Sequence, residues 1–127
     1  MVTDPIADFL VRVRNAGLAH KEAVVVSISN MTSAIETLLE KEGYVAHVAK
    51  KKVGPFTITL SYKNGRPAIQ GSKRISKPSR RMYMGVREVK PVKRGHGLLV
   101  LSTPAGVLTG KEAREKRVGG EILFEIW

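Results

Sequence analysis

Three histidines are the side chains best suited to proton transfer or metal binding in this chain of 127 residues. His20, His47 and His96 are not spaced from one another, or from a carboxylate, as metal ligands are. His96 stands in the glycine-rich stretch 94–97, which would suit a phosphate-ester enzyme, but that stretch lacks the spacing of a phosphate-binding loop and no helix is expected after it. A plain turn is the favoured interpretation, and the sequence predicts no metal site.

Two carboxylates, Asp4 and Asp8, lie one helical turn apart and could be mistaken for a catalytic pair. Both fall in the first turn of a predicted helix, where acidic side chains stabilise the positive end of the helix dipole, and this explains them fully. The chain has no cysteine, so disulfides and thiolate metal ligands are excluded. No serine lies in a nucleophile elbow. We therefore expect no enzyme, no cofactor and no small-molecule substrate.

Positive charge is the strongest signal in the composition. The chain carries 22 Lys and Arg against 11 Asp and Glu, a net charge of +11. Residues 1–63 hold 8 basic and 6 acidic side chains, whereas residues 64–127 hold 14 and 5. Such an excess repels itself in a compact domain unless a polyanion neutralises it. We expect the partner to dock mainly on the second half, although nucleic acid, an anionic membrane and an acidic protein would all satisfy the charge.

One segment combines cations with an aromatic side chain. Lys77, Arg80 and Arg81 could contact phosphates, and Tyr83 could stack on a base or ribose. The alternative is a solvated basic turn beside a core tyrosine. Because the basic residues and the tyrosine occur together, the nucleic-acid interpretation is favoured.

Two further segments offer hydrogen bonds rather than charge. Ser102 and Thr103 open a predicted turn over residues 102–106, and their hydroxyls could bond phosphate, 2′-OH or base edges. Gly120 permits close approach of another backbone, and Glu121 could accept hydrogen bonds from base amino groups. On these residues alone, an ordinary turn and a glycine helix cap are the favoured interpretations.

The basic run Lys50, Lys51 and Lys52 is the last candidate, together with Arg12 and Arg14. Auxiliary phosphate contacts and a solvated hairpin both remain open for it.

The elements that would position these residues follow from apolar periodicity. In the first half we expect the order α-β-α-β-β. The helices run from the Asp4-Pro5 cap to Gly17 and from about Asn30 to a Gly43 cap, and the strands cover 23–28, 44–48 and 56–62, the last ending at Asn64-Gly65.

In the second half we expect strands over 81–85, 98–101 and 122–126. A short helix begins at a Thr109–Glu112 capping box and ends at Gly119-Gly120.

These elements predict an α+β fold of two small α/β subdomains. The first covers residues 1–65, and the second, residues 66–127, is a β-rich layer with one short helix that would bind the partner. The first residues lack a secretory signal, and no apolar run approaches the roughly 20 residues needed to span a bilayer, so we expect a soluble cytoplasmic protein. A peripheral membrane protein is disfavoured because the helices lack a Lys-rich face opposite bulky aromatics.

Short motifs across nearly the whole chain resemble ribosomal protein eight of the small subunit, in its bacterial form. They are TDPIAD (3–8), RVRNA (12–16), EGYV (42–45), RISKP (74–78), RRMY (80–83), LST (101–103), GV (106–107), EAR (112–114), GGE (119–121) and the terminal Trp127. The resemblance implies a structural, RNA-binding protein of translation that binds the central domain of 16S ribosomal RNA directly and early, at an irregular stem, and helps assemble the platform of the 30S subunit.

The resemblance also implies partners. Small-subunit ribosomal proteins five and twelve are the expected neighbours, and family members can bind their own messenger RNA. The expected location is the ribosome in the cytoplasm.

The residues that the resemblance implicates lie mainly in the second subdomain. Ser102, Thr103, Gly120 and Glu121 are the expected RNA contacts, with Tyr83 beside them. This reverses the interpretation of the turn and of the glycine pair as purely structural.

The first subdomain is expected to add Thr3, Asp4 and the Lys50–Lys52 run as RNA contacts.

The sequence departs from the family pattern at Pro104. The family usually has a serine there, and proline lacks both the hydroxyl and a backbone N–H. A general binder of double-stranded nucleic acid, of chromatin type, remains the main alternative.

Overall fold

The computed structural model describes residues 4–26, 30–49, 55–85, 87 and 97–127. Thr3, the Lys50–Lys52 run and His96 therefore lie outside the described residues. The chain forms two compact units, Met1–Gly71 and Ser72–Trp127. Residues 66–71, which the sequence placed with the second subdomain, belong to the first unit.

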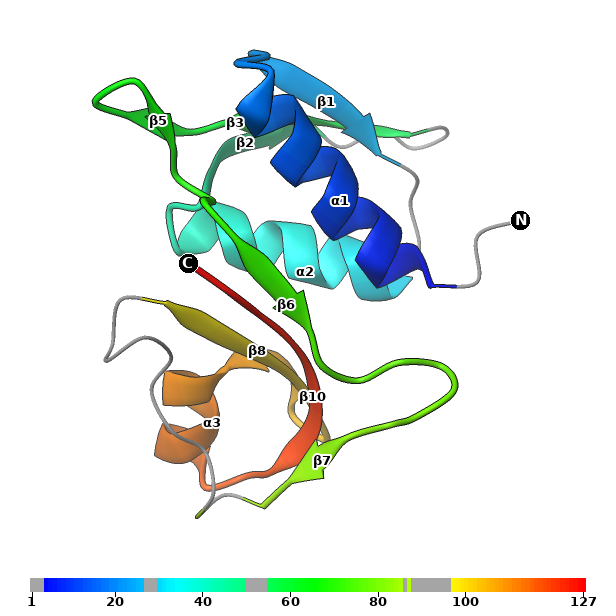
Figure 1. The fold of residues 1–127 in the computed structure, drawn as a ribbon. Helices are drawn as coiled ribbons and strands as arrows, with labels where there is room; N and C mark the ends of the chain where they lie inside the picture. The colour runs from blue at the N-terminus through cyan, green and yellow to red at the C-terminus, as the bar shows by residue number, and fades with distance from the viewer. Residues whose placement is uncertain (1–3, 27–29, 50–54, 86, 88–96) are drawn as a thin grey trace. The chain divides into compact units, whose positions relative to one another are not determined.

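In its described residues the first unit has two helices and two small antiparallel sheets (Figure 1). Its elements are α1 (Pro5–Leu18), β1 (Ala23–Val26), α2 (Asn30–Lys41), β2 (Val45–Ala49), β3 (Phe56–Leu60), β4 (Tyr62–Lys63) and β5 (Arg66–Pro67). The larger sheet has the order β1-β3-β2, and β4 pairs with β5. Since α1 contacts both β1 and α2, and α2 contacts β2, the two helices cover one face of this sheet. The expected order α-β-α-β-β is confirmed, with the β4–β5 hairpin added.

Helix α1 begins as its sequence predicts and ends slightly later. The Asp4 side chain accepts a hydrogen bond from the Ala7 amide at 3.3 Å, which caps the helix. Gly17 was expected to stop the helix, but α1 continues through Leu18 and Gly17 is buried. A Cβ on Gly17 would lie 3.1 Å from the Pro67 Cβ, so the glycine lets β5 approach the helix closely.

The strand expected over residues 56–62 is divided in two, and a hairpin follows it. Strand β3 ends at Leu60, and β4 begins at Tyr62. Asn64 and Gly65 have φ of 54° and 76°, the left-handed conformations of a two-residue hairpin turn. The sequence prediction took Asn64-Gly65 as the end of a strand and missed β5, because two-residue strands are too short to show periodicity.

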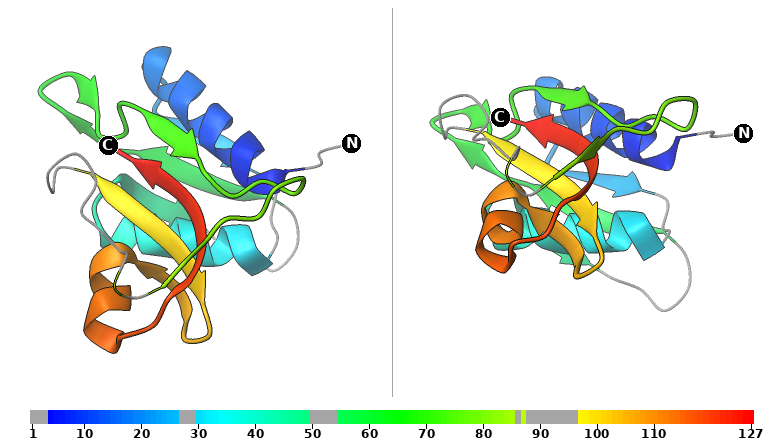
Figure 2. Two further views of the ribbon diagram at one scale, coloured as in Figure 1. Left: turned by 60° about the horizontal axis from the view of Figure 1, so that its bottom comes forward. Right: turned by 90° about the horizontal axis from the view of Figure 1, so that it is seen from below.

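The described part of the second unit is a five-stranded antiparallel sheet with one α-helix against it. Its elements are β6 (Ser72–Arg74), β7 (Tyr83–Met84), β8 (Leu98–Thr103), β9 (Gly106–Thr109), α3 (Gly110–Lys116) and β10 (Gly120–Ile126). The sheet order is β6-β10-β8-β9, and β7 also pairs with β10. Figures 1 and 2 show α3 beside β8, where Ala113 packs with the buried Leu99, Leu101 and Ile122. The predicted α+β class and the β-rich layer with one helix are confirmed.

Three local predictions for the second unit are wrong. Ser102 and Thr103 belong to β8 and Gly106 to β9, so the turn is shorter than residues 102–106. The helix ends at Lys116 with Arg117 in the left-handed conformation (φ 55°), rather than at the glycine pair. Strand β6 was not expected, because its three residues carry no apolar alternation.

The capping box at the start of α3 gives a direct test of the fold. The Thr109 hydroxyl accepts from the Glu112 amide at 3.1 Å, and the Glu112 carboxylate accepts from the Thr109 amide at 3.2 Å. Thr109→Val keeps the shape of this buried side chain but removes the acceptor, so we expect the free energy of unfolding to fall by about 1 kcal/mol in urea titrations. Thr109→Ser keeps the hydroxyl and should retain most of that stability; equal losses in both variants would contradict the capping role.

Candidate nucleic-acid interface

Three of the residues singled out in the sequence form a row across neighbouring strands. Glu121 on β10 pairs with Tyr83 on β7 and with Ser102 on β8. Directly opposed residues of an antiparallel sheet project from the same face, so these three side chains share one face. Leu101 and Ile122, each one position away along its strand, face the core beneath α3. The row therefore lies on the sheet face opposite α3, where Tyr83 is 68% exposed.

The hydroxyl of Thr103 is used inside the β8–β9 hairpin. It donates to the Gly106 carbonyl oxygen at 2.8 Å and accepts from the Ala105 amide at 3.1 Å. These bonds brace the turn without using the amide position of residue 104, and for that reason Pro104 fits there. Thr103 thus holds the hairpin in shape beside Ser102, at the end of the row.

The glycine pair before Glu121 is required by close packing within the sheet. A Cβ on Gly120 would lie 2.2 Å from the Ser102 carbonyl oxygen, and a Cβ on Gly119 would lie 2.4 Å from the Met84 carbonyl oxygen. Neither distance is possible for a real side chain. The sequence predicted close backbone approach here, and the structure shows that the approaching backbone is that of the same sheet.

Glu121 connects the row to the basic segment. Its Oε2 accepts hydrogen bonds from the Ser76 hydroxyl and from Arg81 Nη1, the latter at 3.1 Å. The Glu121 side chain is only 17% exposed. The sequence singled out Glu121 and Arg81 but gave no role to Ser76, since a lone serine in a basic stretch has no distinguishing pattern.

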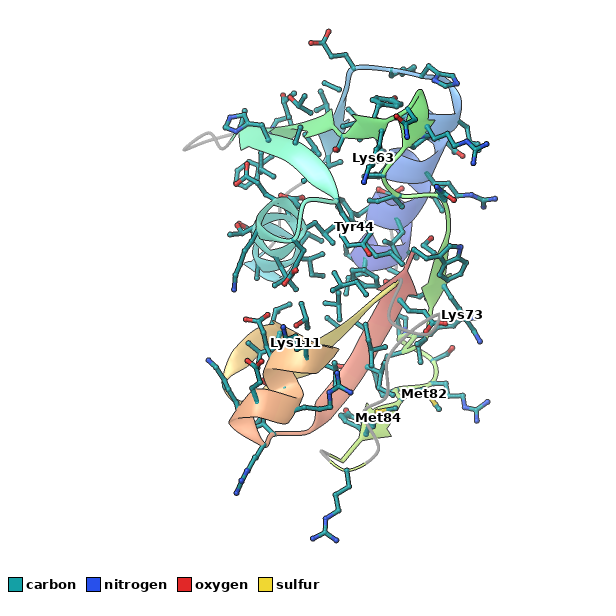
Figure 3. The ribbon with its side chains drawn as sticks, turned by 90° about the vertical axis from the view of Figure 1, so that its left-hand side faces the viewer. Tyr44, Lys63, Lys73, Met82, Met84 and Lys111 are labelled. Atoms are coloured by element: carbon teal, nitrogen blue, oxygen red, sulfur yellow. The ribbon has the colours of Figure 1, made fainter. Side chains whose placement is uncertain are left out.

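The basic segment itself is a short hairpin between β6 and β7. The Lys77 and Arg80 backbones exchange hydrogen bonds of 2.9 and 3.0 Å around the turn residues Pro78 and Ser79. Lys77, Arg80 and Arg81 are all exposed. The Arg81–Glu121 bond thus joins the basic hairpin to the Tyr83–Glu121–Ser102 row, whose middle residue lies on β10. Figure 3 shows Met82 and Met84 on the β7 side of that strand.

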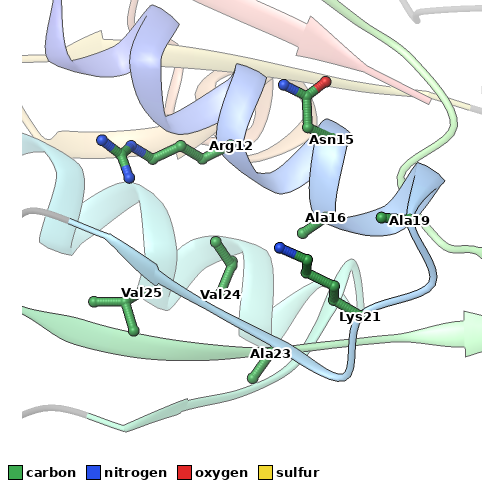
Figure 4. A pocket seen from close by; sticks show the side chains of 8 residues that line it. All are labelled: Arg12, Asn15, Ala16, Ala19, Lys21, Ala23, Val24 and Val25. Atoms are coloured by element: carbon green, nitrogen blue, oxygen red, sulfur yellow. The ribbon is translucent and has the colours of Figure 1, made fainter.

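The first unit has a separate cationic groove between α1 and β1 (Figure 4). Its volume is about 570 Å³. It is lined by Arg12, Asn15, Ala16, Ala19, Lys21, Ala23, Val24 and Val25. Arg12 Nε donates to Asp8 Oδ2 at 2.8 Å, which fixes one of the two cations at the groove. The sequence offered Arg12 as an auxiliary phosphate contact but missed Lys21, because only the fold brings the start of β1 beside α1.

The described residues contain neither a metal-binding cluster nor a helix that could cross a membrane. Within them no group of three or more His, Asp or Glu is placed to hold a metal ion. None of the helices that they form is both long and apolar enough to cross a bilayer.

Two polar residues of the first unit have structural surroundings that do not involve the row. Burial raises the pKa of the Tyr44 hydroxyl, and the charge of Glu42 raises it further. Asp4, a predicted contact, also belongs to that unit and caps α1.

Comparisons with known proteins agree along the whole chain. The model of the family described as ribosomal protein S8 matches residues 4–127. The small ribosomal subunit protein uS8 of Desulfovibrio desulfuricans is 50% identical over 127 residues, and that of Nitratidesulfovibrio vulgaris is 48% identical over 127 residues. The uS8 protein of Kosmotoga olearia is 45% identical over 134 aligned residues. In all three cases the match covers 100% of both chains.

The tight contact at Gly120 predicts a specific cost of substitution. Gly120→Ala places a methyl group against the Ser102 carbonyl, so β8 and β10 must separate, and we expect a loss of about 1–3 kcal/mol in the free energy of unfolding. Gly106→Ala is the matched control, because a Cβ there meets open space and only its φ of 112° is strained. Amide exchange should accelerate along β8 and β10 in Gly120→Ala but near the turn alone in Gly106→Ala. Unchanged β8 and β10 protection in Gly120→Ala would refute the packing argument.

Proposed function

The chain belongs to the ribosomal protein S8 family, and we propose that it binds the central domain of 16S ribosomal RNA directly, through its second unit, and helps assemble the platform of the 30S subunit. Family membership makes it a structural constituent of the small ribosomal subunit, located in the ribosome, with ribosomal RNA and ribosomal proteins as partners. It is not an enzyme.

The observation that carries this proposal is the Tyr83–Glu121–Ser102 row beside a basic hairpin. A regular RNA duplex hides its base edges in a deep, narrow groove, whereas an irregular stem exposes bases and 2′-hydroxyls. The exposed ring of Tyr83 can stack on such a base, and Ser102 can exchange hydrogen bonds with it. Gly120 and Thr103 shape this surface rather than supply charge, since one allows the close packing of β8 and the other braces the hairpin.

Positive charge would supply the rest of the affinity. The exposed Lys77, Arg80 and Arg81 are placed to hold phosphates that flank the bound bases. Because Arg81 is also bonded to Glu121, phosphate and base contacts would be held in one register. We assign recognition to the row and non-specific attraction to the hairpin.

The first unit would add auxiliary RNA contacts. Arg12, Asn15 and Lys21 line its groove and together can bind a phosphate and a neighbouring hydroxyl. Thr3 and the Lys50–Lys52 run are proposed as further contacts on the resemblance alone. Asp4 is proposed as a contact through its backbone, because its carboxylate caps α1.

Small-subunit proteins five and twelve are the proposed protein neighbours, and the cytoplasm is the proposed compartment. Binding to the chain's own messenger RNA is proposed as a second use of the same surface, since any RNA that copies the stem would fit the same row. The alternative, a general double-stranded nucleic-acid binder, shares the charge but has no use for the row. Competition between a central-domain stem and a random duplex at physiological salt separates the two, and equal binding would reject our proposal.

Specific and non-specific binding should respond to different substitutions. Ser102→Ala removes a hydrogen-bonding group worth about 1 kcal/mol, so we expect roughly fivefold weaker binding to the stem and unchanged binding to a random duplex. Arg80→Ala should weaken both, because a phosphate contact carries no sequence information. Lys111→Ala removes an exposed cation from α3, on the other face of the sheet, and is the matched control. A Ser102→Ala variant with an unaltered ratio of the two affinities would refute the recognition role.

Salt dependence tests the electrostatic part separately. If about six phosphates are neutralised, log affinity should fall with log salt with a slope of roughly −4 to −5. Arg80→Ala should make the slope shallower by roughly 0.7–0.9, whereas Ser102→Ala should leave it unchanged. Filter-binding titrations between about 50 and 200 mM salt measure it directly. A slope near zero would eliminate the phosphate contacts.

A further inference from the structure

Strands β6 and β7 lie on the same edge of β10, and the basic hairpin is the segment that joins them. Residues 124–126 of β10 pair with β6, and residues 120–121 pair with β7, while β8 occupies the opposite edge. Both pairings are antiparallel, so β6 and β7 read as one edge strand interrupted by a looped-out insertion. Figure 1 shows this insertion swinging away from the sheet between the two arrows.

Ser76 at the start of the insertion and Met82 at its end form its neck, which hydrogen bonds hold closed. The Ile122 carbonyl oxygen accepts from the Ser76 amide at 3.0 Å, and the Ile122 amide donates to the Met82 carbonyl oxygen at 2.9 Å. One residue of β10 therefore holds both ends of the loop. These are backbone bonds, and any residue other than proline could form them.

Ser76 adds the side-chain bonds that are specific to this sequence. Its hydroxyl donates to Glu121 Oε2 and accepts from the Met82 amide at 3.1 Å. Ser76 is fully buried (0% exposed), whereas the loop residues 77–81 are exposed. Ser76, the first residue of the neck, is thus hydrogen-bonded through its side chain to Met82, the last residue of the neck, and to the Glu121 carboxylate of the row. Because it is buried, it cannot contact RNA itself.

We propose that Ser76 is a positioning residue for RNA binding, which orders the basic loop and orients Glu121 through one shared hydroxyl. The proposal rests on the function proposed above and extends it to a residue that makes no RNA contact. With the neck closed, Lys77, Arg80 and Arg81 are presented in one arrangement before RNA arrives. Without the hydroxyl, the Met82 amide and the Glu121 carboxylate each lose a partner, and the loop is held only by its backbone bonds, so RNA must supply the rest of its ordering.

The size of the effect follows from the fraction of molecules with an ordered loop. If the loop of a Ser76→Ala variant is competent about one tenth of the time, apparent affinity for the stem falls about tenfold. The slope of log affinity against log salt should not change, because no cation that contacts phosphate is removed. Removal of a phosphate contact would instead change affinity and slope together.

The test compares Ser76→Ala with Ser79→Ala, a second serine of the same segment that is exposed at the tip of the loop. Hydrogen exchange of the free protein and binding of a central-domain stem are measured well below the unfolding temperature. In Ser76→Ala we expect faster exchange of the Met82 amide, tenfold weaker stem binding and an unchanged salt slope. Ser79→Ala should match the wild type in all three. Unaltered Met82 exchange, or unaltered affinity despite faster exchange, would overturn the proposal.

Glu121→Gln provides a second variant that does not depend on the folding of Ser76→Ala. The amide oxygen still accepts from the serine, so we expect a smaller loss of affinity in the same direction, and the double variant should lose less than the product of the two single effects. Independent, multiplying effects would overturn the shared role. If the wild type fails to bind the stem, the proposed function falls, while Met82 exchange in the free protein still decides whether Ser76 orders the loop.

Discussion

The backbone of β10 has hydrogen-bonded neighbours along both edges, and the second unit depends on how closely those neighbours approach. At Gly120 the Ser102 carbonyl lies where a Cβ would be, and at Gly119 the Met84 carbonyl does the same. This absence of side chains brings β7 and β8 against β10 at one level, so Tyr83, Glu121 and Ser102 fall into register. The chemistry of the surface is thus a consequence of close backbone packing at the two residues that precede Glu121.

Different parts of the second unit supply the charge that attracts RNA and the shape that would distinguish one RNA from another. The sheet supplies a row whose carboxylate, Glu121, is paired with Arg81, and the exposed Lys77, Arg80 and Arg81 sit on a hairpin that leaves the sheet between β6 and β7. Such a row suits the discrimination of one folded RNA from another, since misplaced hydroxyls and rings lose their partners. Cations on a protruding hairpin suit capture at a distance, because attraction to phosphates is not directional. The Arg81–Glu121 bond joins the two parts.

Periodicity in the sequence predicted the helices and the longer strands correctly, because each buries a regular apolar face. The Thr109–Glu112 capping box and the Asp4 cap were also predicted correctly, since both depend on residues close in sequence. The failures have local causes: strands β5 and β6 are too short to show periodicity, β8 continues into its hairpin with β9, and α3 ends where Arg117 adopts the left-handed conformation. The family was recognised from motifs and is confirmed, but the same motifs did not reveal that Ser76 lies against Glu121, 45 positions away along the chain.

Because the edge strand is interrupted, the pairing of β6 and β7 with β10 does not depend on the length of the loop between them. Because β6 and β7 are each anchored to β10 on their own side of Ile122, inserting or deleting residues between 77 and 81 would leave both registers in place. Most hairpin loops lack this freedom, since their length dictates how the flanking strands pair. Natural variation or deliberate grafting at this position could therefore alter the reach of the basic segment while the sheet and its core stay as they are.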